Sequence, residues 1–143
     1  MSRSLNRSAH VVYSAEQMFD LVNDIESYPQ FLPNCVGARV TSRTATCVEA
    51  ELTLSKAGTH HRFATRNTLS FPHKMTLQLL SGPFKEFDGC WEFKDITGGC
   101  EVSFTLKFEF SNFLLNMAAG KWMEDTASQQ VDVVCQRARA LYG

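Results

Sequence analysis

The stretch NFLLNMAAGKWMEDTASQQVDVVCQRARAL, residues Asn112 to Leu141, is the longest segment of this chain that can form a single helix. Apolar and small side chains recur in it at steps of three and four residues, which is the repeat of one helix face. A face of that length needs an equally long apolar surface to cover it. Because the face mixes bulky and small residues, the helix can be either close-packed or the roof of a ligand cavity. The stripe consists of Phe113, Met117, Gly120, Met123, Ala127, Val131, Val134, Ala138 and Leu141.

One acidic residue, Glu124, interrupts this stripe. We expect it at the point where the helix passes the mouth of such a cavity. The opposite face of the helix carries a few apolar residues, of which Trp122 is the largest.

The rest of the chain supplies the covering surface as a series of strands. Six segments with strand periodicity follow Pro33, separated by short turns that contain Gly, Pro, Ser, Lys or Thr. In the last of them every second residue is apolar, so one face of that strand is buried and the other is wet. Consecutive strands of this kind predict an antiparallel sheet. The segments are Val36–Arg43, Cys47–Leu54, His60–Leu69, Lys74–Leu80, Phe84–Phe93 and Cys100–Phe110.

The N-terminal part adds a further strand and a short helix. Ser4–Val12 has strand alternation, and Ser14-Ala-Glu-Gln17 has the form of a capping box that begins a helix. Two prolines, Pro29 and Pro33, stop a long helix, although a brief helical turn from Pro29 is allowed. This order predicts an α+β fold in one domain, residues 1–143, with a curved antiparallel sheet of about seven strands around the C-terminal helix and one or two short helices after the first strand.

Composition and charge restrict the classes of function. The net charge of -1 gives no overall basic field, which argues against binding to DNA. The five cysteines are odd in number and include no CxxC pair, so neither a disulfide framework nor a zinc site is indicated. No run of about 18 apolar residues is present. We therefore expect a cytoplasmic protein without a transmembrane segment, a bound metal or a required cofactor.

The register of one hairpin predicts which polar side chains face the helix. A tight turn at Ala57-Gly58 places Phe63 beside Leu52 on the inner face of the sheet. Three polar side chains then also point inward, where an unsatisfied polar group costs about 1–3 kcal/mol. Water, one another or the head group of a ligand can satisfy them. They are His61, Thr65 and Asn67.

Five groups of residues follow one another along the chain at a characteristic spacing. They are Tyr28-Pro-Gln-Phe-Leu-Pro-Asn-Cys35, Ser55-Lys-Ala-Gly58, Phe63-Ala-Thr-Arg-Asn67, Gly82-Pro-Phe84 with Gly89-Cys-Trp-Glu-Phe93, and Phe108-Glu-Phe-Ser-Asn112. Together they resemble the bacterial ribosome association toxin (RatA) family, which is similar to the mitochondrial coenzyme Q-binding proteins and lies in the START-like, polyketide cyclase-like superfamily. The resemblance extends from about Arg3 to Tyr142. It implies a helix-grip fold, in which the sheet wraps around the long helix with a hydrophobic cavity between them.

The resemblance also implies two functions. Relatives bind ubiquinone or similar lipids in support of respiration, or bind the large ribosomal subunit so that the subunits cannot associate. We therefore expect a noncatalytic protein that encloses ubiquinone or another isoprenoid or lipid. The alternative is a toxin or regulator that binds the large ribosomal subunit. A third possibility is an enzyme of the cyclase or hydrolase kind. Only the inward polar residues support it, and the sequence has no GxSxG or HExxH motif.

The candidate ligand contacts lie on the inner faces of the strands and of the helix. For the head group we expect His61, Thr65 and Asn67. The apolar part of the ligand would contact Phe63, Trp91, Phe104, Phe108, Met117 and Met123. A plain packed core uses the same residue types, so composition alone does not decide between the two.

The candidate partner surface combines basic residues with one exposed aromatic residue. Lys56 lies at the hairpin tip, and Arg62 and Arg66 lie on the outer face of the sheet. Trp122, on the back of the helix, completes the surface. Glu49 and Glu51 are expected to pair with the two arginines, so a solvated, salt-bridged face is the alternative to an RNA-binding one.

Overall fold

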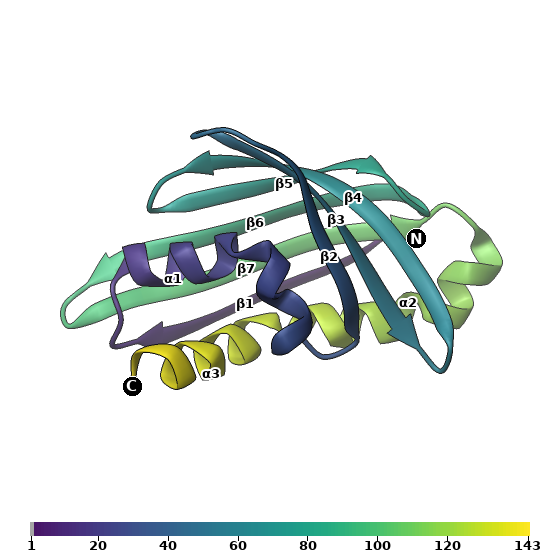
Figure 1. Ribbon diagram of the computed structural model, residues 1–143. Helices are drawn as coiled ribbons and strands as arrows, with labels where there is room; N and C mark the ends of the chain where they lie inside the picture. The colour runs from purple at the N-terminus through teal and green to yellow at the C-terminus, as the bar shows by residue number, and fades with distance from the viewer. Residues whose placement is uncertain (1) are drawn as a thin grey trace.

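A computed structural model describes residues 2–143. Seven antiparallel strands form one curved sheet, and the helices lie along its concave side (Figure 1). The strand order is β1-β7-β6-β5-β4-β3-β2, so the first strand closes against the last. The predicted α+β helix-grip arrangement is confirmed. The elements are β1 (Arg3–Val11), α1 (Ala15–Asn23), the 3-10 helix η1 (Ile25–Gln30), β2 (Cys35–Arg43), β3 (Cys47–Lys56), β4 (Thr59–Ser70), β5 (Lys74–Ser81), β6 (Phe84–Ile96), β7 (Gly99–Phe110), α2 (Phe113–Ser128) and α3 (Gln130–Tyr142).

The first helical segment forms largely as the sequence predicts. The Ser14 hydroxyl accepts a hydrogen bond from the Gln17 backbone N–H at 3.1 Å, and the Ser14 N–H donates to the Gln17 side chain at 2.9 Å. This reciprocal pair satisfies two N–H groups that a helix start leaves free. The following helical turn differs from the prediction, because η1 begins at Ile25 and not at Pro29.

The predicted C-terminal helix is interrupted at Gln129 and forms two joined helices, α2 and α3. At the junction the Thr126 carbonyl accepts from the Gln129 N–H at 3.3 Å and from the Gln130 side-chain amide at 3.2 Å. Both donors compete for the oxygen to which the Gln130 N–H would bond in a regular helix. The helix therefore tightens for one residue and bends there.

The buried face of α2 is also rotated from the predicted stripe. Phe113 and Met117 are exposed, whereas Ala119 and Thr126 are buried beside Met123. By the step of 100 degrees per residue, the face lies about 60 degrees nearer to Trp122 than the apolar pattern indicates. The prediction therefore fails at the start of the helix and holds from Gly120 to Ala138, where the stripe is buried.

The predicted register of the β3–β4 hairpin is confirmed. Phe63 pairs with Leu52 and Arg66 with Glu49, and the two turn residues Ala57 and Gly58 have positive φ values of 49° and 83°. This register turns alternate β4 side chains toward the helices.

The core is divided into a filled half and a hollow half. Under α1, the Phe19 ring lies 5.1 Å from the Phe71 ring and 5.8 Å from the Phe93 ring, and Met18 is fully buried. No equivalent of α1 covers the sheet on the other side of η1, where only α2 and the start of α3 lie over the strands (Figure 1). The candidate site lies in that half.

We predict that Gly99→Ala destabilises the fold by about 1–3 kcal/mol. A Cβ atom at Gly99 would lie 1.8 Å from the Val11 carbonyl oxygen and 2.9 Å from the Val12 Cα, and neither backbone atom can move without breaking the β1–β7 edge. Urea unfolding at pH 7.5 measures the change. Gly37→Ala is the control, since its Cβ would meet nothing nearer than Thr53 at 3.5 Å. Equal free energies of unfolding for the two variants would contradict the prediction.

Candidate functional site

A cavity lies between the concave face of the sheet and the junction of α2 with α3. Its volume is about 90 Å³. One water needs about 10–15 Å³ measured in this way, and an engineered apolar cavity of about 150 Å³ admits benzene. The cavity therefore has room for several waters or a small chemical group, and a ring or chain enters only if a wall moves.

Most of the cavity wall is apolar. The sheet contributes Ala50, Leu52, Leu54, Phe63, Met75, Leu77, Phe87, Trp91, Phe104 and Leu106. The segment around η1 contributes Ile25, Tyr28, Phe31 and Leu32, and the C-terminal helices contribute Met123, Ala127 and Val134. The ring centroids of Trp91 and Phe104 lie 4.5 Å apart in a stacked arrangement, so this part of the wall is flat and rigid.

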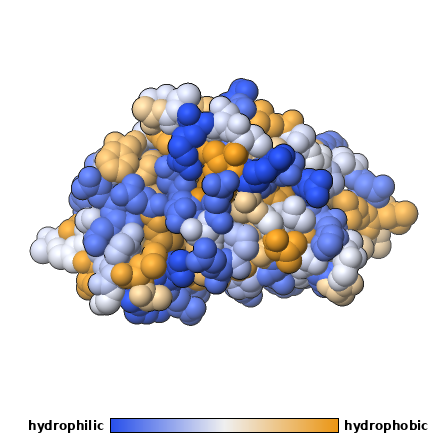
Figure 2. Space-filling model, viewed as in Figure 1, coloured by the Kyte–Doolittle hydropathy of each residue, from blue (hydrophilic) through white to orange (hydrophobic). Residues whose placement is uncertain are grey.

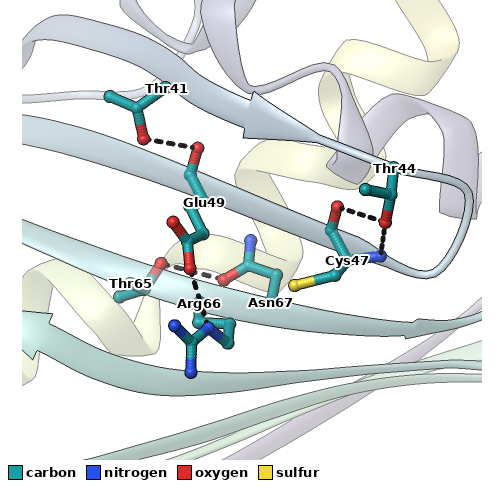
Figure 3. A network of polar contacts seen from close by, with 7 residues as sticks. All are labelled: Thr41, Thr44, Cys47, Glu49, Thr65, Arg66 and Asn67. Atoms are coloured by element: carbon teal, nitrogen blue, oxygen red, sulfur yellow. Dashed lines mark hydrogen bonds and ion pairs between the residues drawn. The ribbon is translucent and has the colours of Figure 1, made fainter.

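Four polar side chains interrupt the apolar wall. Thr65 and Asn67 come from β4, and Thr126 and Gln130 come from the helix junction. The Thr65 hydroxyl donates to the Asn67 side-chain oxygen at 2.8 Å (Figure 3). Arg66, between them in sequence, turns instead to Glu49 on the outer face, as strand alternation requires (Figure 3).

Tyr28 is the one titratable side chain among the described residues that line the cavity. Its hydroxyl donates to the Val22 carbonyl, and burial raises the pKa of Tyr28 far above the ordinary value of a tyrosine. The phenol is therefore neutral and already paired. The described part of the wall offers no carboxylate, imidazole, amine or thiol for proton transfer or nucleophilic attack.

The structure brings six of the nine predicted ligand contacts to the cavity. They are Phe63, Thr65, Asn67, Trp91, Phe104 and Met123. Phe108 is fully buried, but its ring packs edge-on against Phe84 and Phe110 and does not line the cavity. Met117 is exposed because of the rotated face of α2. His61 points inward as predicted, but does not line the cavity.

His61 lies between aromatic rings at the open end of the sheet. Its ring centroid is 5.6 Å from that of Trp122 and 6.1 Å from that of Phe110. Burial, followed by the charge of His60, lowers the pKa of His61. The imidazole is therefore neutral at pH 7, and it forms part of the packing that holds α2 to the hairpin.

The predicted partner surface is largely engaged within the molecule. Arg66 pairs with Glu49 at 2.8 Å and Arg62 with Glu51 at 3.7 Å, as expected for a salt-bridged face. The prediction that Trp122 faces away from the sheet is wrong. Trp122 is half-buried, and the Lys56 ammonium lies 5.9 Å from the centre of its ring. The rotation of the α2 face brings the indole over the hairpin.

An ion pair between Arg3 and Glu124 lies on the side of α2 away from Trp122, next to Gly120. Glu124 accepts from the Arg3 guanidinium at 3.1 Å and is not part of the cavity wall, so the expected position at the cavity mouth is wrong. A Cβ atom at Gly120 would lie 2.6 Å from the Arg3 Nε. Gly120 therefore makes room for the guanidinium, whereas Ala127 is the small residue that leaves space in the cavity.

Two polar lining residues, Thr126 and Gln130, were missed by the sequence analysis. A search for an apolar stripe passes over them, although they follow Met123 and Ala127 at the helical step of three. That step was the available signal, because it places a threonine and a glutamine on the inner face.

An apolar patch marks the end of the molecule where α2 begins (right side of Figures 1 and 2). Phe113, Leu114 and Met117 are exposed by 75%, 72% and 66%. Single exposed apolar residues are common, but three large ones within five positions are typical of an interaction surface.

Neither a metal-binding cluster nor a membrane-spanning helix occurs among residues 2–143. No group of three or more His, Cys, Asp or Glu residues in this range is arranged to hold a metal ion. None of the helices in this range is both long enough and apolar enough to cross a membrane.

Sequence comparison relates the chain to three kinds of protein. Residues 11–135 match the family described as polyketide cyclase / dehydrase and lipid transport. The ribosome association toxin RatA of Escherichia coli (strain K12) is 41% identical over 96% of this chain and 88% of that protein. RatA of Pseudomonas aeruginosa is 38% identical over 100% of both chains. The mitochondrial coenzyme Q-binding protein COQ10 homolog B of Xenopus laevis is 26% identical over 92% of this chain and 56% of that protein.

Solved structures share the fold. The 18 kDa protein CC1736 from Caulobacter crescentus has a TM-score of 0.74 and 26% identity, covering 100% of this chain and 99% of that chain. The Zhui aromatase/cyclase from Streptomyces has a TM-score of 0.85 at 13% identity, covering 97% and 94%. At that identity the second likeness concerns the fold alone.

We predict that His61 makes the fold less stable in mild acid. The pKa of His61 is lower in the folded chain than in the unfolded chain, where it is near 6.5. Neutral His61 therefore contributes fully to the free energy of unfolding above the unfolded pKa, and this contribution is lost as pH falls through the folded pKa. Urea unfolding at pH 7.5 and 5.0 should show a larger loss for the wild type than for His61→Phe, which keeps an aromatic ring but cannot titrate. His60→Gln is the control and should retain most of the loss. An equal loss in His61→Phe would show the prediction to be wrong.

Proposed function

Since this chain belongs to the polyketide cyclase / dehydrase and lipid transport family, and within it to the ribosome association toxins, we propose that it is a noncatalytic binding protein for a hydrophobic ligand. The ligand is ubiquinone or another isoprenoid or lipid, held between the sheet and the C-terminal helices. The observation that supports this best is the cavity itself, which is apolar over most of its wall and carries four polar groups. The coenzyme Q-binding relative adds support for a quinone.

The absence of acid–base groups from the described cavity wall favours binding over catalysis. A hydrolase or cyclase needs a group that gives or takes a proton within reach of its substrate. The closest titratable candidate, Tyr28, donates a hydrogen bond to the Val22 carbonyl and has a raised pKa. His61, the best candidate from the sequence, lies outside the cavity, packed against Trp122.

The size of the cavity determines how such a ligand would be held. A volume of about 90 Å³ takes only a small chemical group, so a head-group ring or an isoprenoid tail enters only if a wall moves. We propose that α2 is the wall that moves. It is held to β1 by the Arg3–Glu124 pair, whose side chains are 29% and 34% exposed, and Gln129 already interrupts the helix. The tail would then lie along the inner face of α2.

We predict that filling the cavity weakens ligand uptake. Ala127→Leu replaces a methyl group of the wall with an isobutyl group, whereas Ala118→Leu makes the same change at an exposed position of the same helix. Bound lipid is first removed by extraction with organic solvent. The protein is then incubated with ubiquinone bearing two isoprene units, and bound quinone is measured by mass spectrometry. The wild type and Ala118→Leu should take up quinone, and Ala127→Leu should bind it about tenfold more weakly or worse.

Two results would reject the proposal. The first is a wild-type protein that yields no extractable lipid and takes up no quinone. The second is unchanged uptake by Ala127→Leu with native stability.

A second function is supported by the relatives named ribosome association toxin and by the apolar patch on α2. We propose that the chain also binds the large ribosomal subunit, in the cytoplasm, through Phe113, Leu114 and Met117 of α2, together with Lys56 at the hairpin tip, whose ammonium lies over Trp122 of the same helix. The arginines Arg62 and Arg66 are paired with glutamates and contribute less to such a surface.

We predict that the protein comigrates with purified large subunits in sucrose gradients at low salt. The double variant Phe113→Ser, Met117→Ser should reduce comigration about tenfold, because it removes most of the apolar surface that binding would bury. Val12→Ser is the control, since Val12 is 78% exposed just after the end of β1. Absence of the wild type from the large-subunit fractions, or equal comigration of the double variant, would contradict this function.

A further inference from the structure

We infer that the cavity contains a hydrogen-bonding subsite formed by Asn67 on β4 and Thr126 on α2, and that this subsite selects an uncharged ligand with a carbonyl oxygen on a ring. The inference rests on the proposed function, because it concerns the head group of the ligand that the cavity would hold. It adds the chemical class of that head group and the two residues that distinguish it.

Asn67 supplies the donor from the sheet. Its side chain is 4% exposed, and its amide oxygen is occupied by the Thr65 hydroxyl at 2.8 Å. Among residues 2–143 no group accepts a hydrogen bond from its amide nitrogen. This nitrogen is also not fully enclosed by protein atoms. A buried N–H donor without a partner is costly. The nitrogen therefore faces the cavity, where a ligand oxygen can accept from it.

Thr126 supplies the donor from the helix. Its side chain is 6% exposed and lines the same cavity. A helical threonine ordinarily donates back to a carbonyl of the preceding turn. No hydroxyl bond of Thr126 occurs within the described chain. The interrupted helix holds it in place, because Gln130 donates to the Thr126 carbonyl at 3.2 Å.

The absence of charge in the described wall excludes an ionised head group. Lys, Arg and His do not occur among the described lining residues, so a carboxylate or phosphate would lose its water without gaining a counter-charge. An uncharged oxygen is the acceptor that two neutral donors can satisfy. The stacked Trp91 and Phe104 rings, 4.5 Å apart, add a flat wall that suits a planar ring.

Three probes with the same methyl-substituted ring test the inference. Duroquinone carries two carbonyl oxygens, durene carries none, and 2,3,5,6-tetramethylbenzoate carries a charge. All four ring carbons of duroquinone that could react with a thiol are substituted, which protects the five free cysteines. Binding of each probe to the full chain is measured by isothermal titration calorimetry at pH 7.5.

The wild type should bind duroquinone about 3- to 10-fold more tightly than durene, as expected for one or two hydrogen bonds, and tetramethylbenzoate most weakly of the three. Asn67→Leu and Thr126→Val keep the side-chain volume and remove the donor, so each should lower the preference for duroquinone toward one. Thr68→Val, the same kind of change at an exposed position of β4, should leave the preference intact.

The outcomes separate this inference from the proposed function. Equal binding of duroquinone and durene by the wild type, tighter binding of the benzoate, or a preference unchanged in both variants overturns the subsite and leaves the cavity function standing. If neither duroquinone nor durene binds, the proposed function fails and the subsite with it.

Discussion

The burial of a single helical layer against one concave sheet is the constraint on which the rest of the structure depends. A curved sheet of seven strands encloses more space than one helix can fill. On one side α1 supplies the missing volume through Met18 and Phe19, which are almost completely buried. On the other side only η1, α2 and the start of α3 are available, and small side chains such as Ala50 and Ala127 line the gap. The cavity is therefore a consequence of where α1 ends along the sheet.

The bend between α2 and α3 explains why that cavity is not purely apolar. A straight helix would have used the Thr126 carbonyl within its own ladder of hydrogen bonds. At the bend this oxygen is shared by the Gln129 N–H and the Gln130 side chain, and Thr126 and Gln130 both lie on the inner face. Opposite them, strand alternation brings Thr65 and Asn67 to the same cavity. Polar groups thus converge from two elements whose local geometry, and not any acid–base chemistry, places them there.

The sequence predicts the sheet well because alternation along each strand shows which residues share a face. The register of one turn then shows which residues of the neighbouring strand pair with them. The turn at Ala57-Gly58 was sufficient to pair Arg66 with Glu49 and to turn Thr65 and Asn67 inward. The helix was harder to predict. The predicted apolar stripe starts with residues that are exposed, and the observed buried face includes Thr126, which a pattern of apolar residues leaves out. The pairing of Arg3 with Glu124 across 121 positions has no local signal at all. Only the folded chain shows that the absence of a side chain at Gly120 leaves space for the Arg3 guanidinium.

Both proposed functions involve the same helix, and this has a thermodynamic consequence. The inner face of α2 lines the cavity through Met123 and Ala127, and its first turn carries Phe113 and Met117 at the surface. A ligand that displaces α2 from the sheet also displaces that surface, because a helix moves as a unit. Linkage then requires that a partner bound to the displaced α2 raises the affinity for the ligand by the same factor as the ligand raises the affinity for the partner. A ligand that fits the resting cavity without moving α2 favours the resting position of the helix, and it lowers the affinity for a partner that binds the displaced α2.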